Sequence, residues 1–277
     1  MDVVLRGFID ESIDGKEVIP RVFNVSCLVA NNSAWPYIEW DWVEVLDEKN
    51  KELEKQGRKR ITRFHASDFS NSLGEFKGWD DPDEKKEFVQ QLVPIFGKHG
   101  IHTYGHDIPL QLLVSEIPET AVDPKGFAYA FLFELILRDI CKNSLSVYPE
   151  SIISLHHDHC DYDAHLQTVF GNLVDDKTFP CAHKFASLTP ERWQHCIPLQ
   201  PADFVAYENF KEGMRRVVGA PARRRKSLEM FLDLDSISGR SEGLTLQGIR
   251  KLKQILYGMD DKTRRLFMQQ RLRIGRG

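Results

Sequence analysis

The chain lacks several features that would assign it to a well-defined class. No run of about 18 or more apolar residues occurs in its 277 residues, which excludes a transmembrane helix. The N-terminal residues carry neither a basic segment nor a long apolar core, so we expect no secretory signal. Internal repeats and low-complexity tracts are also missing. The composition, 42% hydrophobic and 28% charged, is that of an average soluble protein.

Cysteine is scarce and scattered. The five cysteines are odd in number, form no CxxC pair, and lie at positions 27, 141, 160, 181 and 196. This pattern is typical of a reducing cytosol and argues against a disulfide framework or a cysteine-rich zinc site. We therefore predict a cytoplasmic location.

The net charge of −4 conceals an asymmetric distribution. Residues 211–277 hold 17 lysines and arginines against 7 acidic residues, whereas residues 1–210 hold 20 against 34. This split predicts an acidic body with a carboxylate-lined site and a basic C-terminal segment that meets a polyanion. Two simpler explanations are that the two parts attract each other or that the basic tail is only solvated. On charge alone, these explanations are slightly favoured over binding of a polyanion.

Apolar patterning and turn signals predict an opening hairpin, with strands at about 3–10 and 18–30. Further strands are expected at 61–69, 101–108, 151–158 and, weakly, 183–188. Helices are expected at about 35–55, from residue 81, at 127–140, at 164–173 and at 199–216. Two or three short basic helices follow residue 219. A hairpin followed by helices that alternate with single strands predicts an α/β fold with a mixed sheet.

Three acidic residues lie at the ends of predicted elements. Asp10 closes the first strand, Asp158 closes a later strand, and Asp203 lies in the first turn of a helix. Because the ends of neighbouring strands converge, these carboxylates can meet in one cluster. Such a cluster selects Mg²⁺ or Mn²⁺ and supports phosphodiester hydrolysis by a metal-activated water. Each acid taken singly is better explained as structural or solvated.

Asp10 and Glu11 are neighbours, so on a regular strand they point to opposite faces. We expect Asp10 to be the direct ligand and Glu11 to assist. His65, at a strand-to-loop exit, is a candidate general acid or base, although capping the loop explains it equally well. Tyr207 and Lys211 follow Asp203 on one helix face and border the same cleft or simply pack there.

The segment His156-His157-Asp158-His159-Cys160-Asp161 offers donors for a transition metal. Alternation places His156 and Asp158 on one face of the strand and His157 on the other, so the consecutive histidines do not all converge. The hypothesis of a zinc hydrolase that uses His156, His159 and Asp158 is therefore weaker than the hypothesis of a carboxylate Mg²⁺ site. His157 itself is interpreted as a structural histidine.

Three segments together resemble the domain-of-unknown-function 3800 family, which belongs to the ribonuclease H-like superfamily. They are Phe8-Ile9-Asp10-Glu11-Ser12, Phe64-His65-Ala66-Ser67-Asp68, and Leu199-Gln200-Pro201-Ala202-Asp203-Phe204-Val205-Ala206-Tyr207. The resemblance covers roughly residues 3–230. It implies an acidic metal site and a nuclease role, with the family's acids falling on Asp10, Glu11 and Asp203.

The resemblance further implies an α/β fold with a ribonuclease H-like mixed sheet flanked by helices, over residues 1–218. Residues 219–277 would form a basic helical C-terminal extension. Asp158 stands where a mid-chain acid is expected, and Asp161 and Asp163 are the alternatives. The metal ligands would be Asp10, Asp158 and Asp203, with Mg²⁺ or Mn²⁺ as cofactor.

The partner implied by these features is a nucleic acid of unknown type. Its phosphate backbone would be held by Arg223, Arg224, Arg225 and Lys226. No membrane partner is expected, and a homo-oligomer is left open. The rival from another class is a non-catalytic nucleic-acid or protein interaction module of the same fold.

Overall fold

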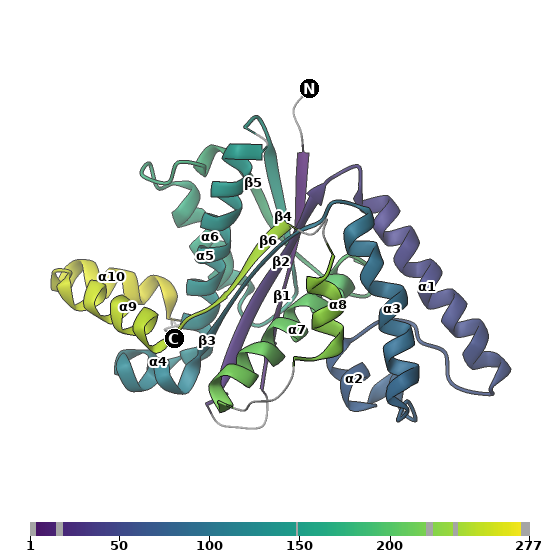
Figure 1. Ribbon diagram of the computed structural model, residues 1–277. Helices are drawn as coiled ribbons and strands as arrows, with labels where there is room; N and C mark the ends of the chain where they lie inside the picture. The colour runs from purple at the N-terminus through teal and green to yellow at the C-terminus, as the bar shows by residue number, and fades with distance from the viewer. Residues whose placement is uncertain (1–3, 15–18, 148, 220–223, 235–237, 273–277) are drawn as a thin grey trace.

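A computed structural model describes residues 4–14, 19–147, 149–219, 224–234 and 238–272. Within them a six-stranded mixed sheet carries helices on both faces (Figure 1). The strands are β1 (Val4–Ile13), β2 (Val22–Asn31), β3 (His102–Pro109), β4 (Ile152–Asp158), β5 (Phe185–Glu191) and β6 (Ser238–Gly243). The longer helices are α1 (Trp35–Lys55), α3 (Pro82–Lys98), α5 (Pro124–Val147), α6 (Asp163–Val174), α7 (Leu199–Val218), α9 (Leu246–Gly258) and α10 (Asp261–Arg271). The shorter ones are α2 (Ala66–Asn71), η1 (Gly74–Phe76), α4 (Leu110–Glu116), η2 (Pro118–Val122), η3 (Ala182–Lys184) and α8 (Lys226–Leu232).

The strands follow the order β5-β4-β1-β2-β3-β6. β2 is antiparallel to both of its neighbours, whereas β1 with β4, β4 with β5, and β3 with β6 are parallel pairs. The predicted opening hairpin and the later parallel crossovers are therefore confirmed. The chain therefore has the α/β architecture with a mixed sheet that the sequence predicts.

Aromatic side chains fill the face of the sheet that α1, α3, α7 and α8 cover, to the right of the sheet in Figure 1. Phe8 of β1 packs edge-on against Trp35, with ring centroids 4.4 Å apart. Phe64 lies at the centre of this core. Its ring contacts those of Trp42, Phe69, Phe76, Phe88 and Phe204.

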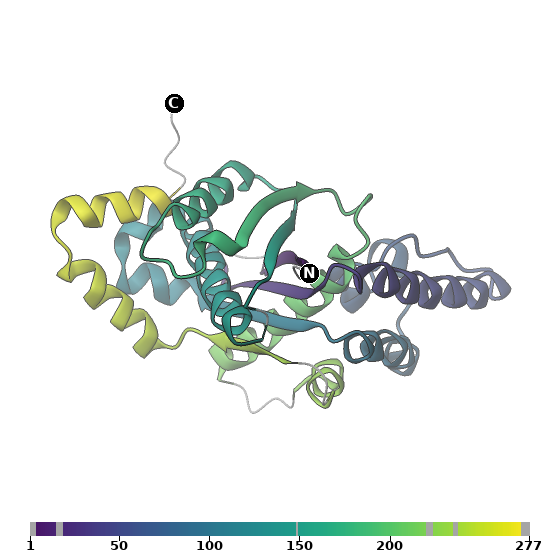
Figure 2. The same ribbon diagram turned by 90° about the horizontal axis from the view of Figure 1, so that it is seen from above.

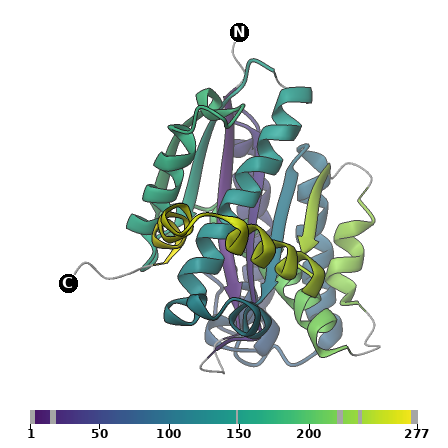
Figure 3. The ribbon, with the colours of Figure 1, turned by 90° about the vertical axis from the view of Figure 1, so that its left-hand side faces the viewer.

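The opposite face of the sheet packs against α4, α5 and α6. Ile9 belongs to this second core, while its neighbour Phe8 belongs to the first, as the alternation along a strand requires. The C-terminal helices α9 and α10 lie over this side and cross α5 in Figure 3, and Figure 2 shows them at the end of the molecule remote from α1. Among the described residues, no helix is long and apolar enough to cross a membrane.

The strand predicted at 61–69 does not form. Residues 61–65 are irregular, and α2 begins at Ala66. The backbone of Ile61 instead pairs with the side chain of Asn50, which accepts from its N–H at 2.7 Å and donates to its carbonyl at 2.8 Å. A side chain thus satisfies the groups that a neighbouring strand would otherwise have paired.

The C-terminal segment was expected to be helical throughout, and that expectation is incomplete. Three helices form there, but residues 238–243 also add β6 to the edge of the sheet beside β3 (Figure 3). The strand has a weak sequence signal because it is short, polar and contains two glycines, Gly239 and Gly243.

The cysteine pattern argued against a disulfide framework, yet one disulfide forms. Cys141 of α5 forms a disulfide with Cys181, with the Cα atoms 5.6 Å apart, and Cys27, Cys160 and Cys196 are free. The pair is separated by 40 positions in the sequence. Sequence spacing did not reveal it, because α5 and the segment before β5 meet only in the folded chain.

Phe64→Ala is expected to destabilise the protein by about 3–5 kcal/mol, since it removes a ring packed on five others and leaves a cavity. Tyr37→Ala is the matched control, because Tyr37 is 67% exposed on α1, and its effect should stay within about 0.5 kcal/mol. Urea unfolding followed by fluorescence measures both. Equal effects of the two substitutions would contradict the central position of Phe64.

Candidate functional site

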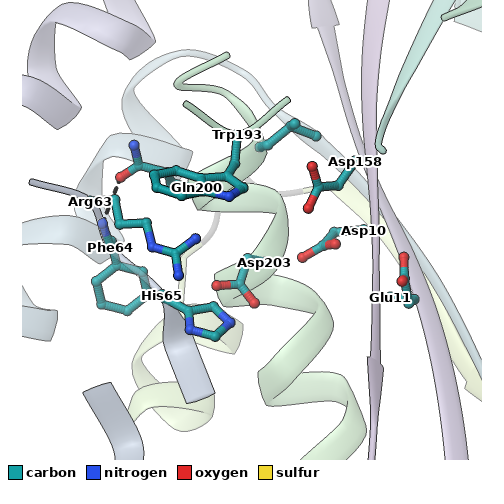
Figure 4. A pocket seen from close by; sticks show the side chains of 10 residues that line it. Asp10, Glu11, Arg63, Phe64, His65, Asp158, Trp193, Gln200 and Asp203 are labelled. Atoms are coloured by element: carbon teal, nitrogen blue, oxygen red, sulfur yellow. Dashed lines mark hydrogen bonds between the residues drawn. The ribbon is translucent and has the colours of Figure 1, made fainter. Parts of the chain in front are cut away.

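Three aspartates lie close together at one edge of the sheet. Asp10 belongs to β1, Asp158 is the last residue of β4, and Asp203 lies near the start of α7. β1 and β4 run parallel with Ile9 paired to His157, so the next residue of each strand reaches the same place. Figure 4 shows the three carboxylates turned toward one another, and they line one pocket of about 210 Å³.

The three carboxylates are half-buried and repel one another. Burial raises the pKa of Asp10 well above its usual range, and the charges of Asp203, Glu11 and Asp158 raise it further. Burial also raises the pKa of Asp158 and that of Asp203. A divalent cation between them would remove this repulsion and favour the ionised forms.

Glu11 follows Asp10 on β1 but points away from the aspartates, toward the other side of the strand (Figure 4). The hydroxyl of Tyr129, on α5, donates a hydrogen bond to Glu11 Oε2 at 2.9 Å. Burial raises the pKa of Glu11 to about 7, and the Tyr129 hydrogen bond works against that rise. Only Asp10 of the adjacent pair faces Asp203, because side chains alternate along a strand.

The loop before α2 is fastened to α7 by two side-chain acceptors. Gln200 Oε1 accepts a hydrogen bond from the backbone N–H of Phe64 at 2.8 Å. Asp203 Oδ2 accepts one from the backbone N–H of Ala66 at 2.7 Å. The residue between these two anchors, His65, is thereby held at the pocket.

His65 lies beside the pocket, and its side chain makes no capping hydrogen bond to α2. It is the residue that precedes α2, and its Nδ1 lies 3.0 Å from Asp68 Oδ2 within that helix. It also lines the pocket, where its charge lowers the pKa of Asp203. Of the two roles predicted from the sequence, capping is not formed by the side chain, and the position beside Asp203 fits a group that exchanges a proton at the pocket.

Arg63 and Trp193 complete the pocket wall, and no motif in the sequence indicates either residue. The guanidinium carbon of Arg63 lies 3.7 Å from the centroid of the Trp193 ring, a stacked cation–π contact (Figure 4). The positive charge of Arg63 lowers the pKa of Asp158 and of Asp203. Local sequence carries no signal for this pair, because the contact joins the loop before α2 to the loop after β5.

The chemistry of the pocket fits a hard divalent cation. Its lining residues carry four carboxylates, Glu11 among them, against one arginine. Sets of oxygen donors select Mg²⁺ or Mn²⁺ over softer metals. Asp10, Asp158 and Asp203 are the residues that would hold such an ion, since Glu11 points to the other side.

The basic segment at the start of α8 does not line this pocket. Arg224 and Arg225 pair with glutamates of α7, at Nε–Oε distances of 3.4 Å and 3.1 Å. Lys226 is exposed, and Arg223 lies outside the described residues. Two of the four cations predicted to hold phosphates are thus already paired within the chain.

Tyr207 and Lys211 lie on α7 beyond Asp203 and do not line the pocket. Tyr207 is buried against Phe210, with ring centroids 6.1 Å apart. The ammonium of Lys211 lies 4.9 Å from the centroid of the Tyr207 ring. The packing interpretation of the two residues is therefore the one that their contacts support.

The zinc set His156, His159 and Asp158 does not assemble. The His156 ring stacks on that of Phe8, with centroids 5.0 Å apart, and His159 is exposed and pairs with Asp163. Asp158 belongs to the carboxylate pocket instead. Of the alternative mid-chain acids, Asp161 is exposed and Asp163 lies at the start of α6, so neither lines this pocket.

A different trio does converge. One ligand atom each from His157, Cys160 and Asp163 lies within 4.8 Å of the other two. Burial raises the pKa of the Cys160 thiol to about 12, and the nearby charge of Glu11 contributes. The sequence pattern had indicated only a structural role for His157.

The free energy of unfolding, measured with a chelator present, is expected to fall between about pH 5 and pH 8 because of the pocket carboxyls. Glu11, with its pKa raised to about 7, and Asp10 keep protons in the folded state that the unfolded chain has already released. Asp10→Asn and Glu11→Gln should each flatten this decline. Urea titrations across the range measure it, and a decline that neither substitution alters would contradict the assignment.

Comparisons with known proteins add no relative from which a role could be transferred. No protein family, no curated protein and no solved structure matches this chain. The site is accordingly defined by the geometry of its own residues.

Proposed function

We propose that this chain is a metal-dependent phosphodiesterase that hydrolyses phosphodiester bonds of a nucleic acid. The observation that carries the proposal is the convergence of Asp10, Asp158 and Asp203 in one pocket, with an arginine on its wall. When such half-buried carboxylates are ionised, burial and mutual repulsion disfavour them, and a bound cation offsets this. Sites with perturbed carboxyls in a cleft are often functional.

The sheet supports a ribonuclease H-like assignment within this proposal. Its order β5-β4-β1-β2-β3, with β2 as the antiparallel strand, is the arrangement expected of such a fold. The resemblance to the domain-of-unknown-function 3800 family suggests the same superfamily. The edge strand β6 would be an addition to that core.

Each residue of the pocket has a distinct task in this proposal. Asp10, Asp158 and Asp203 would hold one or two Mg²⁺ or Mn²⁺ ions, which would activate a water and stabilise the leaving oxygen. Arg63, held flat against Trp193, presents its N–H donors to a phosphate oxygen. His65 holds or delivers a proton beside Asp203.

The substrate's backbone would meet exposed cations that have no ion-pair partner among the described residues. Lys226 is one such cation, whereas Arg224 and Arg225 would first have to leave their α7 glutamates. Substrate contact in this proposal therefore depends more on Arg63 at the pocket than on the basic segment. A non-catalytic interaction module is the competing function, and metal binding separates the two.

Asp10→Asn and Asp203→Asn are each expected to abolish saturable Mn²⁺ binding measured by titration calorimetry, because each removes a charged ligand from the shared set. Asp158→Asn should weaken binding by at least about tenfold, roughly 1.4 kcal/mol. Asp161→Asn is the matched control, since Asp161 is an exposed acid in the same loop that does not line the pocket, and it should bind as the wild type does.

Saturable binding that is lost in both variants would justify screening single- and double-stranded RNA and DNA for cleavage in Mn²⁺. No binding by the wild type, or binding indifferent to all three substitutions, would reject the phosphodiesterase proposal and favour the interaction module. Loss of binding in Asp161→Asn would instead move the mid-chain ligand away from Asp158.

Arg63→Gln is expected to change two affinities in opposite directions. Mn²⁺ should bind more tightly, because a positive charge beside Asp158 and Asp203 is removed. A labelled single-stranded oligonucleotide should bind about tenfold more weakly, because a charge-assisted contact to phosphate is lost. Calorimetry and fluorescence anisotropy measure the two effects.

Arg60→Gln serves as the control, because Arg60 is an exposed arginine in the same segment. Its Nη2 lies 3.8 Å from Asp47 Oδ1. The Arg60→Gln substitution should leave the Mn²⁺ affinity unchanged and alter oligonucleotide binding little. If Arg63→Gln weakens both affinities, or matches Arg60→Gln, then Arg63 does not act at the carboxylate pocket as proposed.

A further inference from the structure

A second group of metal-ligating side chains lies on the other face of the sheet from Asp10. His157, the penultimate residue of β4, lies on the side of α5 and α6, Cys160 packs against the same core, and Asp163 begins α6. One ligand atom from each lies within 4.8 Å of the other two. None of the three lines the carboxylate pocket.

The backbone holds this group in a fixed arrangement. Asp163 Oδ1 accepts a hydrogen bond from the backbone N–H of Cys160 at 2.9 Å, and the backbone N–H of Asp163 donates to the Cys160 carbonyl at 3.2 Å. These two reciprocal bonds close the turn between β4 and α6. The thiol and the carboxylate are therefore positioned by one tight turn rather than by a flexible loop.

His157 supplies an independent observation that points to a ligand. Its side chain is fully buried, and its Nδ1 lies 2.9 Å from the backbone carbonyl of Asp158. A carbonyl only accepts, so Nδ1 carries the proton and Nε2 of the neutral ring keeps a free lone pair. Nε2 is buried and has no hydrogen-bond partner among the described residues. Metal-binding histidines commonly donate their second ring N–H to a backbone carbonyl in this way.

Asp163 already has partners, whereas Nε2 of His157 has none among the described residues. His159, which is 55% exposed, pairs with Asp163, and the Nδ1 atom of His157 lies 3.7 Å from Asp163 Oδ1. Glu11 adds negative charge near Cys160 from β1. A cation in the cluster would therefore meet a buried imidazole, a thiol and two nearby carboxylates.

We propose that His157, Cys160 and Asp163 form a site for a divalent transition metal, with Zn²⁺ as the best match. Nitrogen, sulfur and oxygen donors together suit Zn²⁺ and exclude Mg²⁺, which does not take thiolate ligands. Three protein ligands leave one position of a tetrahedral ion for a water or for His159 after it releases Asp163. The bound metal would tie the end of β4 to α6 next to Asp158. This proposal is independent of the proposed phosphodiesterase function.

The test is a titration of the full chain with Co²⁺, a spectroscopic substitute for Zn²⁺, after chelator treatment and without thiol reductants. We expect one equivalent to bind with a thiolate-to-cobalt charge-transfer band in the near ultraviolet, and Zn²⁺ to displace it. Cys160→Ser should abolish the band. Asp163→Asn and His157→Gln should weaken Co²⁺ binding at least about tenfold.

Cys196→Ser is the matched control, because Cys196 is another free cysteine with a buried side chain. It should keep the band, as should Asp10→Asn and Asp203→Asn, which disable only the carboxylate pocket. No charge-transfer band in the wild type, or a band that survives Cys160→Ser, would overturn the proposal. If Cys160→Ser does not fold by circular dichroism, Asp163→Asn decides, and unchanged Co²⁺ affinity in that variant would overturn the proposal equally.

Discussion

One buried amide holds together the parts on which the carboxylate pocket depends. Gln200 Oε1 accepts hydrogen bonds from the Phe64 backbone N–H at 2.8 Å and from Trp42 Nε1 at 3.2 Å, so α1, α7 and the loop before α2 meet at one oxygen. Asp203 adds a bond to Ala66 one turn further along α7. A buried polar group left without its partner costs about 1–3 kcal/mol, which keeps this arrangement in place. The loop that carries the arginine and the histidine of the pocket is thereby fixed relative to the aspartates.

Local periodicity predicted most of the strands and long helices, and the parallel pairing of β1 with β4 explains why acids at element ends meet. Asp10, Asp158 and Asp203 could be proposed from sequence because each was predicted at the end or start of an element, although β1 continues past Asp10 to Ile13. Arg63 and Trp193 could not, since their contact joins two loops whose conformations depend on tertiary packing. The strand β6 could not be predicted either, because it is short and polar and forms by pairing with the edge strand β3.

The charge asymmetry of the sequence is largely resolved inside the molecule. Arg250 and Lys253 of α9 lie 3.1 Å and 3.2 Å from the carboxylate of Glu116, and Arg271 of α10 pairs with Glu134 of α5. These ion pairs join the basic C-terminal segment to the acidic body. Attraction between the two parts, the alternative that charge alone slightly favoured, accounts for them. The surface therefore presents a weaker positive field than the residue counts suggest.

The disulfide between Cys141 and Cys181 makes a closed covalent ring of the chain between them. That ring contains the whole of β4 and α6, and with them Asp158 and the His157 cluster. In the chain-entropy picture, closing a loop of this length disfavours the unfolded chain by roughly 4 kcal/mol. A single peptide cleavage inside the ring would leave both fragments covalently joined. The strand that contributes to both candidate metal sites therefore stays attached to the protein after any single cut inside the ring.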